Sequence, residues 1–248
     1  MEVHHQSHSE RKKWTHYLWE FFMLFLAVTL GFFVENQREH YSEHRREKEY
    51  AGLLYDDLKK DTTSLHRIIT IKEWRGKKMD SLFYFMSLPD LQKNANSIYY
   101  YSAFLPADIP FTPNDATIQQ LRNSGSLRYF SNLRLYNAIT QYYSTCSFYL
   151  ERQTERKSNF PIELRAKIFR ADEFYSFTRI TPDIMEAIHY PAENMQLLST
   201  DKQVINEFIH YAKDVKMAND LSIMLLQTFI AMQLNELIVA LKKEFHLE

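Results

Sequence analysis

The chain has 248 residues, of which only 4 are glycine, whereas 18 are phenylalanine and 16 are tyrosine. Average usage would give about 17 glycines in a chain of this length, and strand-rich folds use glycine at hairpin turns and bulges. The composition therefore argues against a large β-sandwich or barrel and excludes the glycine-rich phosphate loops of nucleotide enzymes. A formal net charge of −1 indicates no basic domain, so we expect no nucleic-acid partner. The predicted fold class is all-α.

The first predicted element is a transmembrane helix over residues 17–34. This segment, YLWEFFMLFLAVTLGFFV, has one ionisable residue, Glu20, and as an α-helix would span about 27 Å, close to the hydrocarbon thickness of a bilayer. Aromatic residues stand near both ends, where they favour the membrane interface. Bulky residues follow the apolar core, so we expect an uncleaved signal anchor. The alternative is a buried or interfacial helix.

Basic residues flank the anchor on both sides and make its orientation a close decision. They are Arg11, Lys12 and Lys13 before it, and Arg38, Arg45, Arg46 and Lys48 after it. The compact cluster in so short a tail favours a cytoplasmic N-terminus over residues 1–16 and a periplasmic body, with the chain anchored in the inner membrane. Glu20 either reaches the interface or is protonated, or it makes an intramembrane contact with another helix, including that of a second copy.

A charged helical stalk is predicted over residues 35–50, since both charge signs alternate there without glycine or proline. Residues 51–248 then form the α-helical bundle domain. Apolar residues at helical spacing extend the first helix to Pro89. Gly52 and Gly76 interrupt that long helix and are the places where we expect a bend.

Several further helices are expected in the body. Residues 106–113 hold three prolines and predict a loop. Asn114 or Asp115 would cap a short helix that ends at residues 123–125. The remaining predicted helices cover about residues 132–157, a restart after Pro161, residues 183–190, and a last helix capped at residues 199–201 that runs to about residue 245.

The last helix is apolar nearly all round between residues 221 and 234, which predicts the central helix of the bundle. A second membrane span over residues 222–241 is the competing interpretation. It is disfavoured by four polar residues that would lie in the hydrocarbon: Gln227, Gln233, Asn235 and Glu236.

Three blocks of sequence resemble a known family. They are EFFMLFLAVTLGFFVENQREHYSEHRREKEYAGLLYDDLKKD, then ATIQQLRNSGSLRYF with YNAITQYY, and NELIVALKKEF; the middle block contains the pattern T-x-x-x-L-x-x-S-G-x-L-R at Thr117, Leu121, Ser124, Gly125, Leu127 and Arg128. The chain resembles a family of single-pass inner-membrane proteins of Bacteroidota, with an N-terminal anchor and a helical domain of unknown function. The resemblance implies architecture only and brings no catalytic residue, cofactor or ligand.

Two surface patches are the candidate ligand or partner sites. One is the loop with Arg122, Ser124, Gly125 and Arg128, which could form an anion site or be only a helix end and restart. The other is the tyrosine cluster Tyr99, Tyr100 and Tyr101.

Catalytic and metal chemistry have weak signals. Two Glu-x-x-His pairs, Glu186/His189 and Glu207/His210, have the spacing found in bundle metal sites, but chance explains them and we predict no metal or cofactor. The single cysteine, Cys146, is interpreted as a buried, inert thiol.

Function is predicted only in outline. The expectation is a non-enzymatic, membrane-anchored scaffold or interaction subunit that contacts the lipid bilayer and a protein partner or its own copies. The alternative is an extracytoplasmic ligand-binding sensor that acts through a partner membrane protein. An enzyme is the third possibility and would need a clustered polar site.

Overall fold

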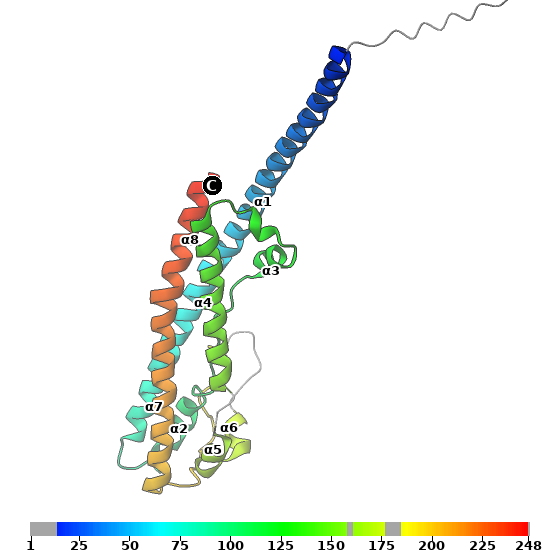
Figure 1. The fold of residues 1–248 in the computed structure, drawn as a ribbon. Coiled ribbons are helices and arrows are strands. Elements are labelled where there is room, and N and C mark those ends of the chain that lie inside the picture. The colour runs from blue at the N-terminus through cyan, green and yellow to red at the C-terminus, as the bar shows by residue number, and fades with distance from the viewer. Residues whose placement is uncertain (1–13, 158–160, 177–184, 248) are drawn as a thin grey trace, which may run out of the picture. The chain divides into compact units, whose positions relative to one another are not determined.

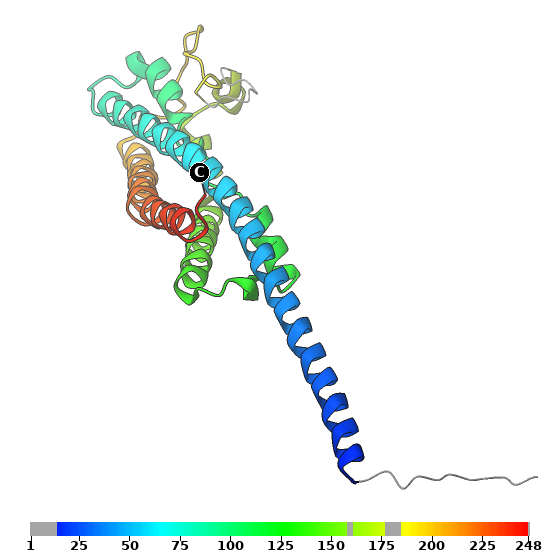
Figure 2. The same ribbon diagram turned by 90° about the horizontal axis from the view of Figure 1, so that it is seen from above.

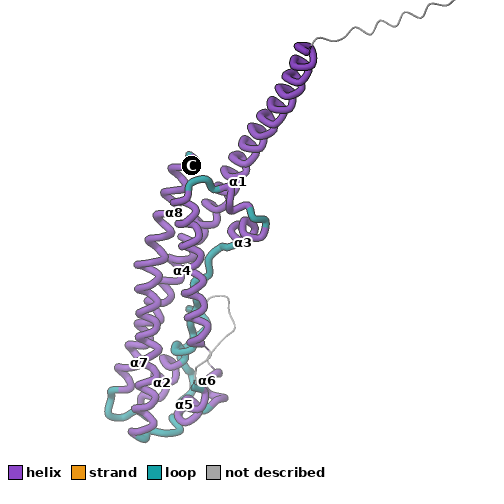
Figure 3. Tube along the Cα trace, in the orientation of Figure 1, coloured by secondary structure: helices purple, strands orange, loops and turns teal. Residues whose placement is uncertain are grey.

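A computed structural model describes residues 14–157, 161–176 and 185–247. The described residues form helices and loops, without strands, apart from one isolated bridge residue at Ile188 (Figures 1 and 3). The all-α prediction is confirmed. The chain divides into two compact units, Met1–Tyr50 and Ala51–Glu248, and each is described by itself.

One helix, α1 (Trp14–Met86), contributes to both units. Its part in the first unit carries the predicted anchor, whose most apolar 18-residue window has no buried residue. The charged part that follows is laced by pairs one turn apart, such as Arg38 Nη2 with Glu35 Oε1 at 2.6 Å and His44 Nδ1 with Glu47 Oε2 at 3.2 Å. An exposed pair such as Arg38 with Glu35 adds a few tenths of a kcal/mol to a helix. The predicted tail falls largely on residues 1–13, outside the described residues.

In the second unit α1 continues without a break from Ala51 to Met86 and ends just before Pro89. Neither Gly52 nor Gly76 interrupts the helix, because α1 runs unbroken through both. Gly76 has a packing role instead: a Cβ there would lie 3.4 Å from Asn219 Nδ2 and 3.7 Å from Lys216 Cε. A side chain longer than a methyl group would meet that neighbouring helix.

Short elements connect α1 to the next long helix. They are η1 (Gln92–Asn94), α2 (Ala95–Ser102), α3 (Ala116–Asn123) and η2 (Ser126–Tyr129), and the predicted loop over residues 106–113 lies between α2 and α3. Asp115 is at the N-cap position of α3, although its side chain makes no cap hydrogen bond. Gly125 follows α3 with φ 66°, the left-handed conformation that glycine adopts at helix ends.

The second long helix is α4 (Leu133–Lys157), followed by α5 (Ile162–Ile168) after Pro161 and α6 (Ala171–Ser176). The predicted helix over 183–190 is wrong where it is described, since residues 185–190 form a turn, a bend and irregular chain with one bridge residue; residues 183 and 184 lie outside the described residues. The third long helix comprises α7 (Lys202–Leu225), the π-helical segment η3 (Leu226–Ile230) and α8 (Ala231–Phe245). Asp201 caps α7 by accepting from Gln203 N and Val204 N.

Within the described residues, three long helices form the bundle of the second unit: α1 from Ala51, α4, and the continuous α7–η3–α8 (Figures 1 and 2). The α7–η3–α8 helix runs antiparallel to the other two. The pairing of side chains follows this course, because Tyr149 of α4 meets Ser222 and Phe130 near the start of α4 meets Phe245. The small helices α2, α5 and α6 pack around one end of the bundle, where Tyr99, Phe169 and Phe208 are buried in one core.

The π turn keeps the buried side of the last helix in register. An α-helix turns about 100° per residue, so positions four apart drift by about 40° at each step. Ser222, Leu226, Ile230 and Leu234 are such a series, and all four are buried. The extra residue of the π turn offsets this drift by about the rotation of one residue. Ile230 and Leu234 therefore stay on the side that faces the core.

The prediction that this helix is central is wrong. Only 22% of its most apolar 18-residue window is buried. Among the residues that the structure describes, it is one of two helices that are long and apolar enough to cross a membrane, and the other is α1. Its outward side carries large exposed apolar residues: Met217, Leu221, Met224, Phe229, Met232 and Val239. The apolar character on all sides of residues 221–234 therefore reflects a core-facing side and a second, uncovered apolar side.

Candidate functional site

A buried ionic cluster joins α1, the loop after α2, and α7. Lys72 Nζ lies 2.6 Å from Asp108 Oδ1, and Arg75 Nη1 lies 3.3 Å from the same oxygen. Arg75 also donates to the carbonyl oxygens of Phe104 and Leu105 at 2.9 and 2.6 Å, and to Asn219 Oδ1 at 3.0 Å. Burial lowers the pKa of the Arg75 guanidinium, and the Asp108 carboxylate opposes that shift. Each group has a partner inside the fold.

A second buried cluster is centred on Asp61, which is fully buried on α1. Its carboxylate accepts hydrogen bonds from Asn114 N at 2.7 Å, Asn114 Nδ2 at 2.6 Å and Tyr142 Oη at 2.7 Å. Burial raises the pKa of Asp61, and these three hydrogen bonds counteract the rise. One turn earlier, Asp57 accepts from Thr117 Oγ1 at 2.6 Å. The cluster ties α3 and α4 to α1.

These two clusters, together the polar lock, are structural. In the first cluster, Lys72 and Arg75 of α1 bond to the loop after α2. In the second cluster, Asp57 and Asp61 of α1 bond to residues at the start of α3. Satisfied buried networks of this kind specify one arrangement of the elements they join. The buried groups of the polar lock bond mainly to one another and to neighbouring backbone and side chains of the fold, so we interpret the lock as structural.

An open cavity of about 460 Å³ lies between α4 and the α7–η3 segment. Its size is within the usual range of small-molecule pockets, about 300–1,000 Å³. The wall is mostly apolar, and its residues are Thr145, Phe148, Tyr149, Arg152 and Gln153 from α4 and Leu221, Ser222, Leu225, Phe229 and Ile230 from the last helix. We call this space the α4–α7 cavity.

A small polar cluster forms one part of the cavity wall. Ser222 Oγ is 2.9 Å from Tyr149 Oη and accepts from Gln153 Nε2 at 3.1 Å. Burial raises the pKa of Tyr149 to about 12, so its hydroxyl remains a neutral donor and acceptor at physiological pH. Arg152 stands over the ring of Phe148, with Cζ 5.2 Å from the ring centroid. An apolar wall with a few polar groups is the usual composition of a ligand site.

The cavity continues into the exposed side of the last helix, which we call the apolar face: Met217, Leu221, Met224, Phe229, Met232 and Val239. Leu221 and Phe229 belong both to this face and to the cavity wall. Large contiguous apolar patches on a protein surface mark sites of interaction with proteins, membranes or ligands. The only sequence signal for either feature was the apolar stretch of residues 221–234, which was interpreted as core.

The loop after α3 is a helix end, as one of its two interpretations predicted. Arg122, Ser124, Gly125 and Arg128 are all exposed. The Ser124 hydroxyl is used locally, donating to Gln120 O at 2.8 Å and lying 2.8 Å from Ser126 Oγ. The Arg128 guanidinium lies over the ring of Tyr129, 5.6 Å from its centroid. An anion site on this loop stays a prediction.

The three tyrosines of the predicted cluster have different environments. Tyr99 is fully buried, lies 3.0 Å from Gln196 O as a donor, and accepts from Arg170 N at 2.9 Å. Burial raises its pKa to about 12. Tyr100 and Tyr101 are half-buried and pack with each other, and Lys78 Nζ lies 5.4 Å from the Tyr100 ring centroid. Tyr99 therefore stabilises the interior of the fold. Of the three tyrosines, Tyr100 and Tyr101 are the ones that reach the surface.

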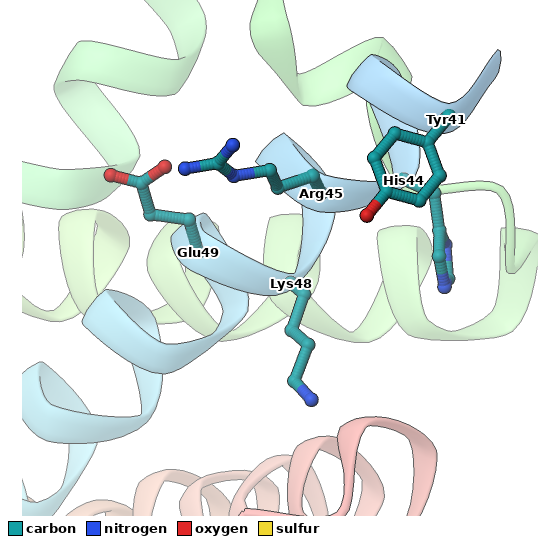
Figure 4. Close-up of a pocket in the computed structure, with 5 residues that line it drawn as sticks. All are labelled: Tyr41, His44, Arg45, Lys48 and Glu49. Carbon is teal, nitrogen blue, oxygen red and sulfur yellow. The ribbon is translucent and has the colours of Figure 1, made fainter. Parts of the chain in front are cut away.

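Residues of the first unit form no enclosed site among those described. Glu20 Oε1 lies 3.1 Å from His16 Nε2, one turn earlier on the same helix. A shallow hollow on the stalk is lined by Tyr41, His44, Arg45, Lys48 and Glu49, all from α1 (Figure 4). In Figure 4 the side chains of Arg45 and Glu49 point toward one another, whereas Lys48 points away from them. An intramembrane contact of Glu20 stays a prediction.

Metal chemistry finds no support within the described part of the chain, where no three His, Cys, Asp or Glu side chains gather. Glu186, His189, Glu207 and His210 are all exposed. Cys146 is fully buried, as predicted, and burial raises the pKa of its thiol to about 12.

Comparisons with other proteins give no match to this chain among family models, curated proteins or solved structures.

Proposed function

We propose that this is a membrane-anchored helical protein that docks a protein partner, or a second copy of the chain, through the apolar face of α7–η3–α8. The observation that carries the proposal is the low burial of a helix as apolar as this one, 22% over its most apolar window. A core helix of that composition would be largely covered by its own domain. When a partner covers water-exposed apolar side chains, the free energy falls by about 25 cal/mol for each Å² of apolar surface that is buried.

Anchoring through residues 17–34 is the second part of the proposal. The segment has a mean hydropathy of 1.9 over its best window and no residue of that window is buried within the protein. A single pass through the inner membrane with a cytoplasmic N-terminus, and membership of the Bacteroidota family that the sequence resembles, belong to the same proposal. Resistance of the full-length chain to extraction by alkaline carbonate, together with protease access to the body in spheroplasts, tests the anchor and its orientation.

The docking test places a photoreactive amino acid at Met232 or Val239, which lie on the apolar face but outside the α4–α7 cavity. Arg67, an exposed residue of α1, is the matched control position. Irradiation of native membranes followed by mass spectrometry should identify the same cross-linked protein, or a second copy of the chain, from both positions on the face and not from Arg67. Adducts with lipid only, or none, would contradict the docking proposal.

A ligand-binding sensor is the second candidate, and the α4–α7 cavity is the observation that favours it. Its volume of about 460 Å³ suits a small molecule. A sensor would transmit binding through the same partner that covers the apolar face, because Leu221 and Phe229 belong to both surfaces.

A further inference from the structure

The α4–α7 cavity has a composition that restricts what it can bind. Five of its ten lining residues are large apolar side chains, namely Phe148, Leu221, Leu225, Phe229 and Ile230. Groups that bind a nucleotide or a sugar, such as several carboxylates or a glycine-rich turn, are not among the lining residues. The body of the ligand must therefore be apolar.

The polar residues of the wall are grouped and define where the ligand's polar end would lie. Gln153 is 6% exposed and donates from its Nε2 to Ser222 Oγ. Arg152, its neighbour in sequence, is 61% exposed and its Nη1 lies 3.7 Å from Glu155 Oε2. An exposed pair of this kind contributes little free energy, and an anionic group of a ligand can replace Glu155 as the partner of the guanidinium.

The π-helical segment supports a binding role. Phe229 and Ile230 both line the cavity, and both lie within η3. Single π turns within α-helices are rare and frequently occur at functional sites. Here the π turn keeps Ile230 and Leu234 on the core side while Phe229 remains half-exposed at 49%, where its ring borders both the cavity and solvent.

We propose that the α4–α7 cavity binds a single-chain anionic amphiphile, with its aliphatic chain between α4 and the α7–η3 segment and its anionic headgroup at Arg152. The headgroup chemistry is a carboxylate or a phosphate, as in a long-chain fatty acid or a lysophospholipid. The binding site does not depend on partner docking. Supply of such a ligand by the bilayer rests on the proposed membrane anchor.

The test uses the full-length chain in lipid nanodiscs and a palmitate analogue with a mid-chain diazirine and a terminal alkyne. After irradiation, mass spectrometry of the peptides should place adducts on α4 near Thr145–Gln153 and on Leu221–Ile230. Thr145→Trp fills the cavity and should reduce this labelling by about tenfold or more, the effect of losing roughly 1.4 kcal/mol of binding free energy. Labelling confined to residues 14–34 would overturn the proposal.

The matched control for the cavity variant is Thr154→Trp. Thr145 and Thr154 both lie on α4, and each donates its hydroxyl to the carbonyl oxygen four residues earlier, at 2.9 and 3.0 Å, but only Thr145 lines the cavity. Thr154→Trp should label like the natural chain. Equal labelling of both variants, with circular dichroism showing that both are folded, would overturn the proposed site.

The headgroup arm compares Arg152→Gln with Arg134→Gln, an exposed arginine near the start of α4 and outside the cavity. Loss of a charge-assisted hydrogen bond predicts about tenfold weaker labelling by the palmitate analogue in Arg152→Gln, with no change for the corresponding fatty-alcohol analogue. Competition by palmitate and by lysophosphatidic acid then distinguishes a carboxylate from a phosphate. An equal loss with acid and alcohol would overturn the assignment of the headgroup to Arg152. None of these variants alters Met232 or Val239, so failure here and failure of partner docking are separately visible.

Discussion

Two groups of buried polar residues in the same bundle have opposite surroundings. In the polar lock, Asp61 accepts three hydrogen bonds and Arg75 binds one carboxylate, two carbonyl oxygens and an amide. In the α4–α7 cavity, Tyr149 and Gln153 each form a hydrogen bond with Ser222 beside open space. The comparison shows that buried polar residues alone do not identify a site. Polar groups that border open volume are the better candidates for contact with a ligand.

The largest expected effect is the loss of the carboxylate in the lock. Asp108→Ala leaves Lys72, which is 1% exposed, and Arg75 without their shared partner, and breaking a buried ion pair from one side costs about 3–5 kcal/mol. Urea unfolding of the full-length chain in nanodiscs, followed by near-ultraviolet circular dichroism, measures the loss. The control is Asp56→Ala, which removes an exposed carboxylate from α1, the helix that carries Lys72 and Arg75. It should change the free energy of unfolding by no more than about 0.5 kcal/mol.

Thiol reactivity compares the interior with the cavity at adjacent positions of α4. Cys146 is fully buried with a pKa raised to about 12 by burial, whereas Thr145 lines the cavity. In a Thr145→Cys/Cys146→Ala variant, the cavity thiol should react with Ellman's reagent at pH 8 on the order of a thousandfold faster than Cys146 in the natural chain, because far more of it is thiolate. Equal rates would show that the cavity is closed or that Cys146 is accessible.

The pH dependence of stability tests the environment of Asp61. Burial raises its folded-state pKa above the unfolded value of about 3.9, so between the two values the folded chain keeps a proton that the unfolded chain has lost. This contribution to stability is complete below the unfolded value and is lost as pH rises through the folded pKa, at up to about 1.4 kcal/mol per pH unit. Asp61→Asn should remove that slope from a series of unfolding curves, and Asp56→Asn should keep it.

The smallest expected effect comes from the cavity's own polar cluster. Ser222→Ala removes the group that Tyr149 and Gln153 share, but water in the open cavity can replace it, so the cost should be about 1 kcal/mol. The same unfolding assay measures it. If Ser222→Ala lowered the free energy of unfolding as much as Asp108→Ala does, the cavity cluster would be structural like the polar lock. The proposed difference between the two regions would then be contradicted.

Local features of the chain could be read from the sequence with good accuracy. Pro89 marks the end of α1, Asn123–Gly125 ends α3, Pro161 precedes α5, and Asp201 caps α7, because each depends on the conformational limits of one or two residues. The all-α fold and the burial of Cys146 follow from composition and from apolar neighbours. The predicted helix over 183–190 fails in its described part, where a turn, a bend and irregular chain with one bridge residue occupy residues 185–190.

The site could not be predicted, because it depends on which side of each helix finds a neighbour. Residues 221–234 are apolar on most sides, and that pattern is equally compatible with a core helix, a membrane span or a helix with one uncovered side. The polar partners are also remote in sequence: Asn219 meets Arg75 and Lys72 across the bundle, and Ser222 meets Tyr149 and Gln153. No local spacing encodes such pairs.

The sequence by itself therefore determined the helical class, the apolar segment over residues 17–34, the charged stretch that follows it and most helix boundaries, since these follow from composition, periodicity and backbone limits. Only the tertiary structure decided that α1 continues through Gly76, that Tyr99 is internal, and that the last helix has an outward apolar face next to a cavity. The physical reason is that burial is a property of neighbours, and three long helices can leave one side of an apolar helix uncovered.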